Sequence, residues 1–172
     1  LHLRGGLYVD RSGTFSNHLI AVTSPATASP GLKGVWRVNA QGQPTLIAQI
    51  ATDHLEGVVT LTNDLSKWGP WAGKVITGDE SFRRIYAVAP NGLVKDYDLG
   101  INPEDFDIIP PNQDLYCVNY RGNNPGWILK LSRQVLADYV GDLLITQEAT
   151  GDGPALLIVS WNGSDFDARR IL

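Results

Sequence analysis

The stretch Arg84-Ile85-Tyr86-Ala87-Val88-Ala89-Pro90-Asn91-Gly92 decides the fold of this chain, because a similar sequence phrase occurs three times. An earlier copy is Gly34-Val35-Trp36-Arg37-Val38-Asn39-Ala40-Gln41-Gly42, and a later one is Leu156-Leu157-Ile158-Val159-Ser160-Trp161-Asn162-Gly163. Each copy is a short apolar or alternating strand that ends in a glycine turn and leads into a second short strand. A unit of this size buries its apolar face only against its neighbours. The phrase therefore predicts a β-propeller or a related array of small sheets.

The rest of the chain is also typical of strands. Eighteen glycines and 10 prolines separate short runs rich in Val, Ile, Leu, Tyr and Trp, which indicates an all-β protein. The one helix candidate, Arg133–Tyr139, is short enough to be a helical turn at best. The predicted strands are Gly6–Asp10, His18–Thr23, Gly34–Asn39, Thr45–Gln49, Gly57–Thr62, Lys74–Thr77, Arg84–Ala89, Val94–Leu99, Phe106–Ile109, Leu115–Tyr120, Trp127–Leu131, Asp142–Gln147, Ala155–Ser160 and Phe166–Ile171.

The spacing of the phrase divides one domain, residues 1–172, into repeat units of about 6–50, 53–100 and 102–172. The turns at Gly42 and Gly92 are 50 residues apart, close to the length of a four-stranded propeller blade. The turn at Gly163 comes 71 residues later, so the third unit needs an inserted hairpin or an extra half blade, which Leu115–Leu131 can supply. We therefore expect about three and a half to four antiparallel blades. A β-sandwich with irregular strand spacing is the alternative.

Composition narrows the class of protein. Hydrophobic residues make up 43% and charged residues 19% of the 172 residues, as in a globular domain. The net charge of −4 argues against a nucleic-acid surface, and no apolar run is long enough to span a membrane. The single Cys117 excludes an internal disulfide. Because no Met is present, even at position 1, we expect a processed chain or a segment of a longer propeller.

Four stretches carry a resemblance to a known family: Lys67–Lys74, Asn102–Pro110, Val140–Glu148 and Trp161–Gly163. Over residues 53–172 the sequence resembles a family of bacterial extracellular proteins without an established activity. That family is similar to propellers of the NHL and gluconolactonase-like type. The resemblance implies a secreted or cell-surface protein. More distantly the repeats resemble calcium-dependent six-bladed lactonases, in which acidic residues at the inner ends of the blades hold a metal.

Two glutamates occupy equivalent points of successive units. Glu56 and Glu104 are 48 residues apart, each just before the first predicted strand of its unit. Carboxylates at that point would meet at the rim of a central channel, where Ca²⁺ could bind to them. Asp105 could add an oxygen, although strand alternation places it on the opposite face from Glu104. The alternative is that these acids accept hydrogen bonds from turn amides.

Other residues qualify as candidates for chemistry or contact. His54 lies beside Glu56 and could act as a general base, or be structural. Gly78-Asp79-Glu80 and Gln147-Glu148 end two equivalent strands, where paired acids could act as general acid and general base or be solvated loop residues. Trp68 and Trp71 flank a Gly-Pro turn, where they could contact a sugar or a partner protein, or fold back as a lid.

The sequence thus favours a non-catalytic extracellular binding or assembly module, which binds a protein or carbohydrate or associates with itself. The alternative is a calcium-dependent hydrolase of the lactonase type, with Glu56 and Glu104 as metal ligands. No nucleotide-binding loop or serine-hydrolase elbow is present.

Overall fold

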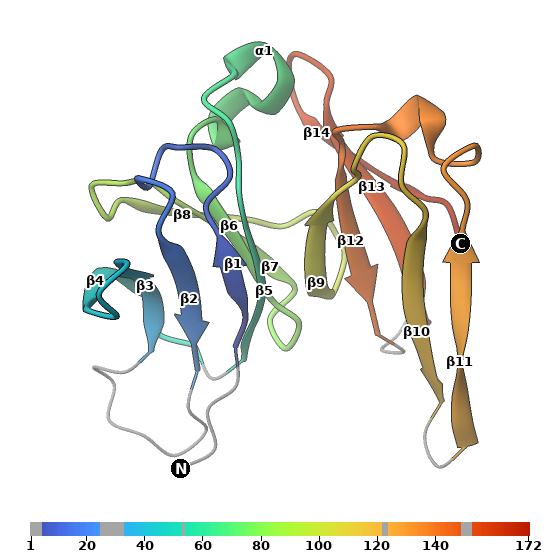
Figure 1. Cartoon of the computed structure of the whole chain (residues 1–172), viewed down its shortest axis with the longest axis horizontal. Helices are drawn as coiled ribbons and strands as arrows, with labels where there is room; N and C mark the ends of the chain where they lie inside the picture. The colour runs from blue at the N-terminus through green and yellow to red at the C-terminus, as the bar shows by residue number, and fades with distance from the viewer. Residues whose placement is uncertain (1–4, 25–32, 53, 122–123, 149–152) are drawn as a thin grey trace.

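The computed structural model describes residues 5–24, 33–52, 54–121, 124–148 and 153–172. Within these ranges the chain forms fourteen strands, arranged as three four-stranded antiparallel sheets and one two-stranded hairpin. The sheets follow one another along the chain like the blades of a propeller (Figure 1). The expectation of an all-β, propeller-like array is confirmed. The fourteen predicted strands all form, and each end lies within three residues of its predicted position.

Each sheet is a meander whose first strand lies on one edge and whose fourth strand lies on the other. We name the three sheets blades 1, 2 and 3. Blade 1 contains β1 (Leu7–Val9), β2 (Leu19–Thr23), β3 (Gly34–Val38) and β4 (Pro44–Gln49). Blade 2 contains β5 (Leu55–Thr60), β6 (Val75–Asp79), β7 (Arg84–Val88) and β8 (Val94–Tyr97). Blade 3 contains β9 (Pro103–Ile108), β12 (Leu143–Gln147), β13 (Ala155–Trp161) and β14 (Phe166–Arg170).

The repeated phrase occupies the same place in every blade. Gly42, Gly92 and Gly163 lie in the turns between the third and fourth strands, with φ values of 75°, 86° and 100°. A residue with a Cβ atom is strained at such angles. The glycines therefore mark the blade register that the sequence predicted.

Two apolar layers hold the blades together. Val22 and Val35 of blade 1 pack with Val58 of blade 2 in one buried cluster. Ile76 of blade 2 and Ile145 of blade 3 belong to a second. Strands such as Leu143–Ile145 are apolar at consecutive positions because both faces of the sheet are covered. Each fully buried aliphatic side chain contributes about 1.5–3 kcal/mol, so face-to-face packing of blades is the main source of stability.

The long third unit contains an inserted hairpin. Strands β10 (Leu115–Arg121) and β11 (Asn124–Leu131) pair with each other between β9 and β12. Leu131 of the hairpin packs with Leu144 and Ile158, on the face of blade 3 that points away from blade 2 (Figure 1). The 71-residue spacing is therefore explained by three blades and a hairpin that covers the far face of the third.

A short helical segment covers one end of blades 2 and 3. It consists of α1 (Leu65–Trp68) and the 3₁₀ turn η2 (Gly69–Trp71), where the sequence predicts only a turn. Asp64 starts α1 by accepting hydrogen bonds from the backbone N–H groups of Ser66 and Lys67. The predicted helical stretch Arg133–Tyr139 contains only the 3₁₀ turn η3 (Ala137–Tyr139).

The tryptophans of this segment lie in the core. Trp71 is completely buried and stacks on Phe166 with ring centroids 3.7 Å apart. Trp68 is 4% exposed, and its Nε1 donates a hydrogen bond to Thr62 Oγ1 (3.0 Å). Lid packing, the alternative that the sequence left open, is therefore what Trp71 does. A ligand contact at Trp71 is wrong, because its ring has no exposed surface.

Candidate metal centre

The four glutamates of the chain gather at one end of blades 2 and 3. They are Glu56, Glu80, Glu104 and Glu148. Glu56 and Glu104 are the second residues of β5 and β9, the first strands of their blades. Glu80 directly follows β6, and Glu148 directly follows β12. Because β6 and β12 run antiparallel to β5 and β9, the end of one strand meets the beginning of the other.

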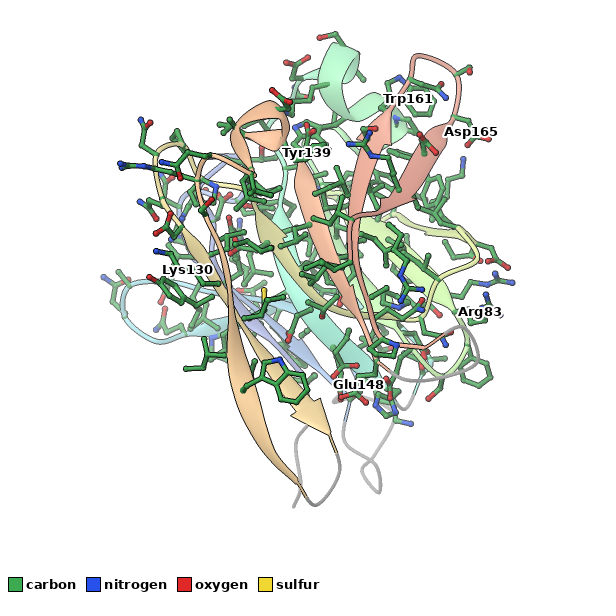
Figure 2. The ribbon with its side chains drawn as sticks, turned by 90° about the vertical axis from the view of Figure 1, so that its right-hand side faces the viewer. Arg83, Lys130, Tyr139, Glu148, Trp161 and Asp165 are labelled. Carbon is green, nitrogen blue, oxygen red and sulfur yellow. The ribbon has the colours of Figure 1, made fainter. Side chains whose placement is uncertain are left out.

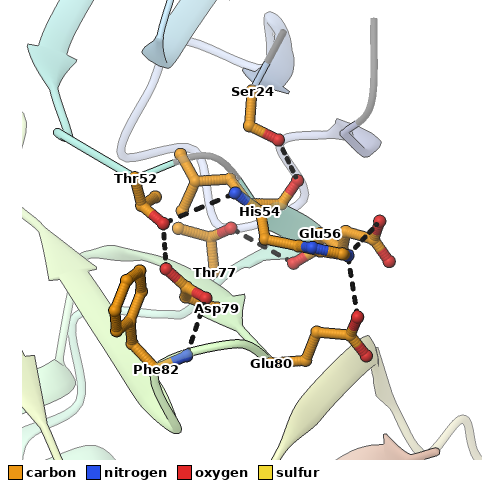
Figure 3. Close-up of polar contacts among 9 residues, drawn as sticks. Ser24, Thr52, His54, Glu56, Thr77, Asp79, Glu80 and Phe82 are labelled. Atoms are coloured by element: carbon orange, nitrogen blue, oxygen red, sulfur yellow. Dashed lines mark hydrogen bonds and ion pairs between the residues drawn. The ribbon is translucent and has the colours of Figure 1, made fainter. Parts of the chain in front are cut away.

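Short distances join these side chains. One carboxylate oxygen each of Glu80, Glu104 and Glu148 lie within 4.8 Å of one another. The Glu104 carboxyl group is hydrogen-bonded to the side chains of Glu56 and Glu80. His54 lies between two of the acids, with Nε2 at 3.1 Å from Glu56 Oε1 and 2.8 Å from Glu80 Oε1 (Figure 3). We call the four glutamates and His54 the carboxylate cluster.

Two glycines of blade 2 allow β9 to come this close. A Cβ atom on Gly57 would lie 2.4 Å from the carbonyl oxygen of Glu104, and one on Gly78 would lie 2.8 Å from Pro103 Cγ. The register between β5 and β6 also shifts at Gly57, between Glu56 and Val58. A bulge of this kind redirects the neighbouring side chain. Close blade packing and the bulge together bring Glu56 toward Glu104.

The cluster strongly perturbs the titration of Glu104. Burial raises the pKa of Glu104 to about 10, and hydrogen bonds and charge repulsion from Glu56 and Glu80 add to the rise. Glu104 therefore keeps its proton at neutral pH, because another negative charge beside two carboxylates is unfavourable. Partial burial also raises the pKa of Asp105, with a further contribution from the charge of Glu56.

The donor set of the cluster fits a hard divalent cation. Ca²⁺ prefers several oxygen ligands, most of them carboxylates. Glu80 Oε2 and Glu104 Oε2 are buried, and neither has a hydrogen-bond partner within the ranges that the structure describes. Buried oxygens of this kind normally have a partner. A cation would satisfy both oxygens and would replace the proton on Glu104.

The outcome for the predicted residues is mixed in detail. Glu56 and Glu104 come together as expected, but both lie inside their strands, since β5 and β9 start two and three residues earlier than predicted. His54 lies beside them. Asp105 is not in the group of three acids whose oxygens are mutually close, and its backbone N–H donates to Thr146 Oγ1 (2.9 Å).

The sequence pattern places Glu80 and Glu148 at the ends of two equivalent strands and does not join them to Glu56 and Glu104. Figure 2 shows Glu148 at one end of blade 3 and Tyr139 and Trp161 at the other. The sequence did hold one signal for this grouping. Its only glutamates are at positions 56, 80, 104 and 148, all near the beginnings or ends of predicted strands.

Comparisons with known proteins leave the family open. The sequence matches no protein-family model, and it matches no curated protein at a significant level. Among solved structures it is similar to a protein named "putative gluconolactonase", with 14% sequence identity and a TM-score of 0.36. The alignment covers 98% of this chain and 67% of that protein. A likeness at this level assigns no activity or substrate to the chain, and the bacterial extracellular family stays a prediction.

Proposed function

We propose that this chain is a cation-binding module of the β-propeller type, in which Glu56, Glu80, Glu104 and Glu148 bind one divalent cation. Ca²⁺ is the first candidate because the ligands are carboxylate oxygens. The observation that carries the proposal is the meeting of these four carboxylates from two neighbouring blades, with two buried oxygens that have no partner among the described residues. His54 holds Glu56 and Glu80 in position.

The cation would act as a clamp between blades 2 and 3. Two of the ligands belong to each blade, so a bound ion neutralises repulsion across the contact of β5 with β9. We infer a role in binding and assembly, in which the cation stiffens this end of the array. The secreted or cell-surface location stays a prediction. It is compatible with a Ca²⁺ site, because extracellular modules bind Ca²⁺ through such oxygen ligands. None of the helices within the described residues is long and apolar enough to cross a membrane.

Calorimetric titration of Ca²⁺ into chelator-treated protein tests this proposal. Wild type should bind one Ca²⁺ per chain and unfold at a higher temperature with the ion than with EGTA. Glu104→Gln keeps the shape of the side chain but removes a charged ligand, so it should weaken binding about tenfold or more.

The matched control is Asp167→Asn, which removes an exposed carboxylate from the edge strand β14 and should leave affinity unchanged. Absence of Ca²⁺ binding by the wild type would refute the proposal. Equal losses in the two variants would mean that general surface charge, and not the cluster, attracts the ion.

One observation favours a second function, a metal-dependent hydrolase of the lactonase type. His54 Nε2 touches two carboxylates of the cluster, and a histidine so placed can exchange protons beside a bound cation. Hydrolysis of simple aliphatic and aromatic lactones, followed in a pH-stat with and without Ca²⁺, tests this function. Activity that needs Ca²⁺ and falls by about a hundredfold in His54→Gln would support it. No lactone hydrolysis by calcium-loaded wild type would eliminate it.

A further inference from the structure

A pocket of about 370 Å³ lies at the ends of β1, β5 and β9, the first strands of the three blades. The carboxylate cluster lies at the opposite end of β5 and β9. The walls of the pocket come from the ends of β1, β5 and β9 and the residues that follow them, from α1, and from Val140 and Gly141 before β12. The cluster lies where β5 and β9 begin, whereas the pocket lies where they end. The two sites share no residue. The volume is within the range of small-molecule sites.

Two cations lie on the wall of this pocket, each against an aromatic ring. Arg11 Cζ is 5.9 Å from the centre of the Tyr8 ring, and Lys67 Nζ is 5.2 Å from that of Trp68. Lys67 and Arg11 are the two cations among the residues that line this pocket. An anion in the pocket would interact with both.

The charges of the two cations are not equally available. Lys67 Nζ lies 3.5 Å from Asp142 Oδ1, so its charge is partly balanced. Arg11 makes no ion pair with any carboxylate of the described residues. The carboxylates of Asp10 and Asp107 also act on the Tyr8 ring, so positive charge at the pocket is not in large excess. A singly charged anion therefore suits the pocket better than a phosphate monoester, and a planar guanidinium binds a carboxylate through two parallel hydrogen bonds.

The remaining walls are mainly apolar. Leu61, Ile108 and Pro110 line the pocket together with Val140. The wall hydroxyl of Thr60 is already committed, since Thr60 Oγ1 donates to Asp10 Oδ1 (2.8 Å). A flat apolar ring would contact these side chains and leave few polar groups without a partner.

We propose that this pocket binds a small monocarboxylate with an apolar ring, of the aromatic-acid class, with the carboxylate on Arg11 and the ring between Trp68, Ile108 and Pro110. Lys67 adds attraction from the other side. The site is separate from the proposed cation centre, so binding should not depend on Ca²⁺.

Titration of benzoate and phenylacetate, followed by calorimetry and by the fluorescence of the tryptophans, tests the proposal. Benzyl alcohol and acetate are the matched probes, because one lacks the charge and the other lacks the ring. We expect measurable binding of the two ring acids in the millimolar range or tighter, and at least about tenfold weaker binding of benzyl alcohol and of acetate. The same affinities should be found in EGTA.

Arg11→Gln should weaken binding of benzoate by about tenfold or more, while Arg37→Gln, a change of the same type on β3, should leave it unchanged. Val140→Trp provides a second test, because a bulky ring at this half-exposed wall position fills the pocket without entering the core. It should abolish binding with normal circular dichroism. The proposal is wrong if wild type binds neither ring acid at millimolar concentration, if acetate binds as tightly as benzoate, or if Val140→Trp binds benzoate normally. Calcium binding would be unaffected by any of these results.

Discussion

Among the described residues, the pKa of Glu104 departs far from that of a free glutamate side chain. Its neighbours Glu56 and Glu80, and its burial, make ionisation costly. The folded-state pKa of about 10 lies above the value in the unfolded chain. The unfolded chain therefore releases this proton at a lower pH than the folded protein. Protonation of Glu104 stabilises the folded state below the unfolded pKa, and this stability is lost as pH rises toward the folded pKa.

The cation-free protein should accordingly be more stable at pH 5 than at pH 9, and Glu104→Gln should flatten this dependence. At pH 9 we expect the variant to melt a few degrees above wild type in EGTA, since the amide has no charge to lose. In Ca²⁺ the order should reverse. Thermal melts across this pH range with and without the ion measure the effect. A wild type whose stability in EGTA rises steadily from pH 5 to pH 9 would contradict the titration of Glu104.

Asp10 is a second buried acid with the opposite behaviour. It is 1% exposed and accepts hydrogen bonds from Thr60 Oγ1, Phe15 N and Asn17 N, at 2.8, 2.8 and 3.1 Å. Burial works to raise the pKa of Asp10, but these bonds and the one from Ser12 outweigh it and hold the pKa below its usual value. The charged form thus fixes the loop after β1 to blade 2.

Asp10→Asn should destabilise the protein by about 2 kcal/mol, because an amide nitrogen would face backbone N–H donors. A lowered folded-state pKa stabilises the protein above the unfolded pKa, and this stability is lost as pH falls through the folded value. The difference in free energy of unfolding between Asp10→Asn and wild type should therefore become smaller in acid. Urea denaturation at pH 7 and at pH 3 measures it. The exposed-site control Asp167→Asn should change stability by less than about 0.5 kcal/mol.

At the scale of elements, the approach of β9 to blade 2 depends on missing side chains. Gly57 has a φ of 57° and Gly42 a φ of 75°, so an added Cβ atom costs similar backbone strain at both. Only at Gly57 would that atom also collide with β9, whereas nothing lies within 4 Å of it at Gly42. Comparing alanine substitutions at Gly57 and Gly42 therefore separates the cost of backbone strain from the cost of the collision with β9.

Gly57→Ala should therefore destabilise the protein more than Gly42→Ala, by about a further 1–3 kcal/mol. Gly57→Ala should also weaken Ca²⁺ binding, because the added methyl group would push β9, and Glu104 with it, away from Glu56. Denaturation and calorimetric titration of both variants give the two quantities. Similar losses of stability in the two variants would show that the contact between β5 and β9 is looser than described.

At the scale of the whole molecule, the outer face of blade 1 carries exposed apolar side chains. Leu7, Ala21, Trp36 and Leu46 lie in one row across its four strands, and Leu7 is 71% exposed. The hairpin at the other end also presents apolar side chains, with Val118 at 78% exposed. Exposed apolar faces of this kind mark interaction sites. The two faces thus offer apolar surface that a second copy of the chain could cover.

We expect the isolated chain to associate with itself through these faces. Leu7→Gln should weaken the association about tenfold, whereas Leu65→Gln, which changes an equally exposed leucine in α1 (71%), should have no effect. Sedimentation velocity over a range of concentrations measures this. A strict monomer at high concentration would exclude self-assembly.

Much of the architecture follows from the sequence alone. The alternation of apolar residues, the glycine turns at positions 42, 92 and 163 and the repeat spacing predicted the strands and the blades, because strand faces and turn angles are set by neighbours in the chain. The same register aligned Glu56 with Glu104. Trp71 was harder to assign, since a Gly-Pro turn does not say whether its aromatic residues point outward or toward Phe166.

What the tertiary structure alone decided is which acids meet. Glu80 and Glu148 are 68 residues apart, and their pairing with Glu56 and Glu104 depends on how closely blades 2 and 3 pack across Gly57 and Gly78. That distance arises from contacts between strands far apart in the chain, which local pattern does not encode. The sequence determined a repeated blade, two copies of which carry a glutamate near the start of the first strand, and the packing of those blades turned the separate acids into one site.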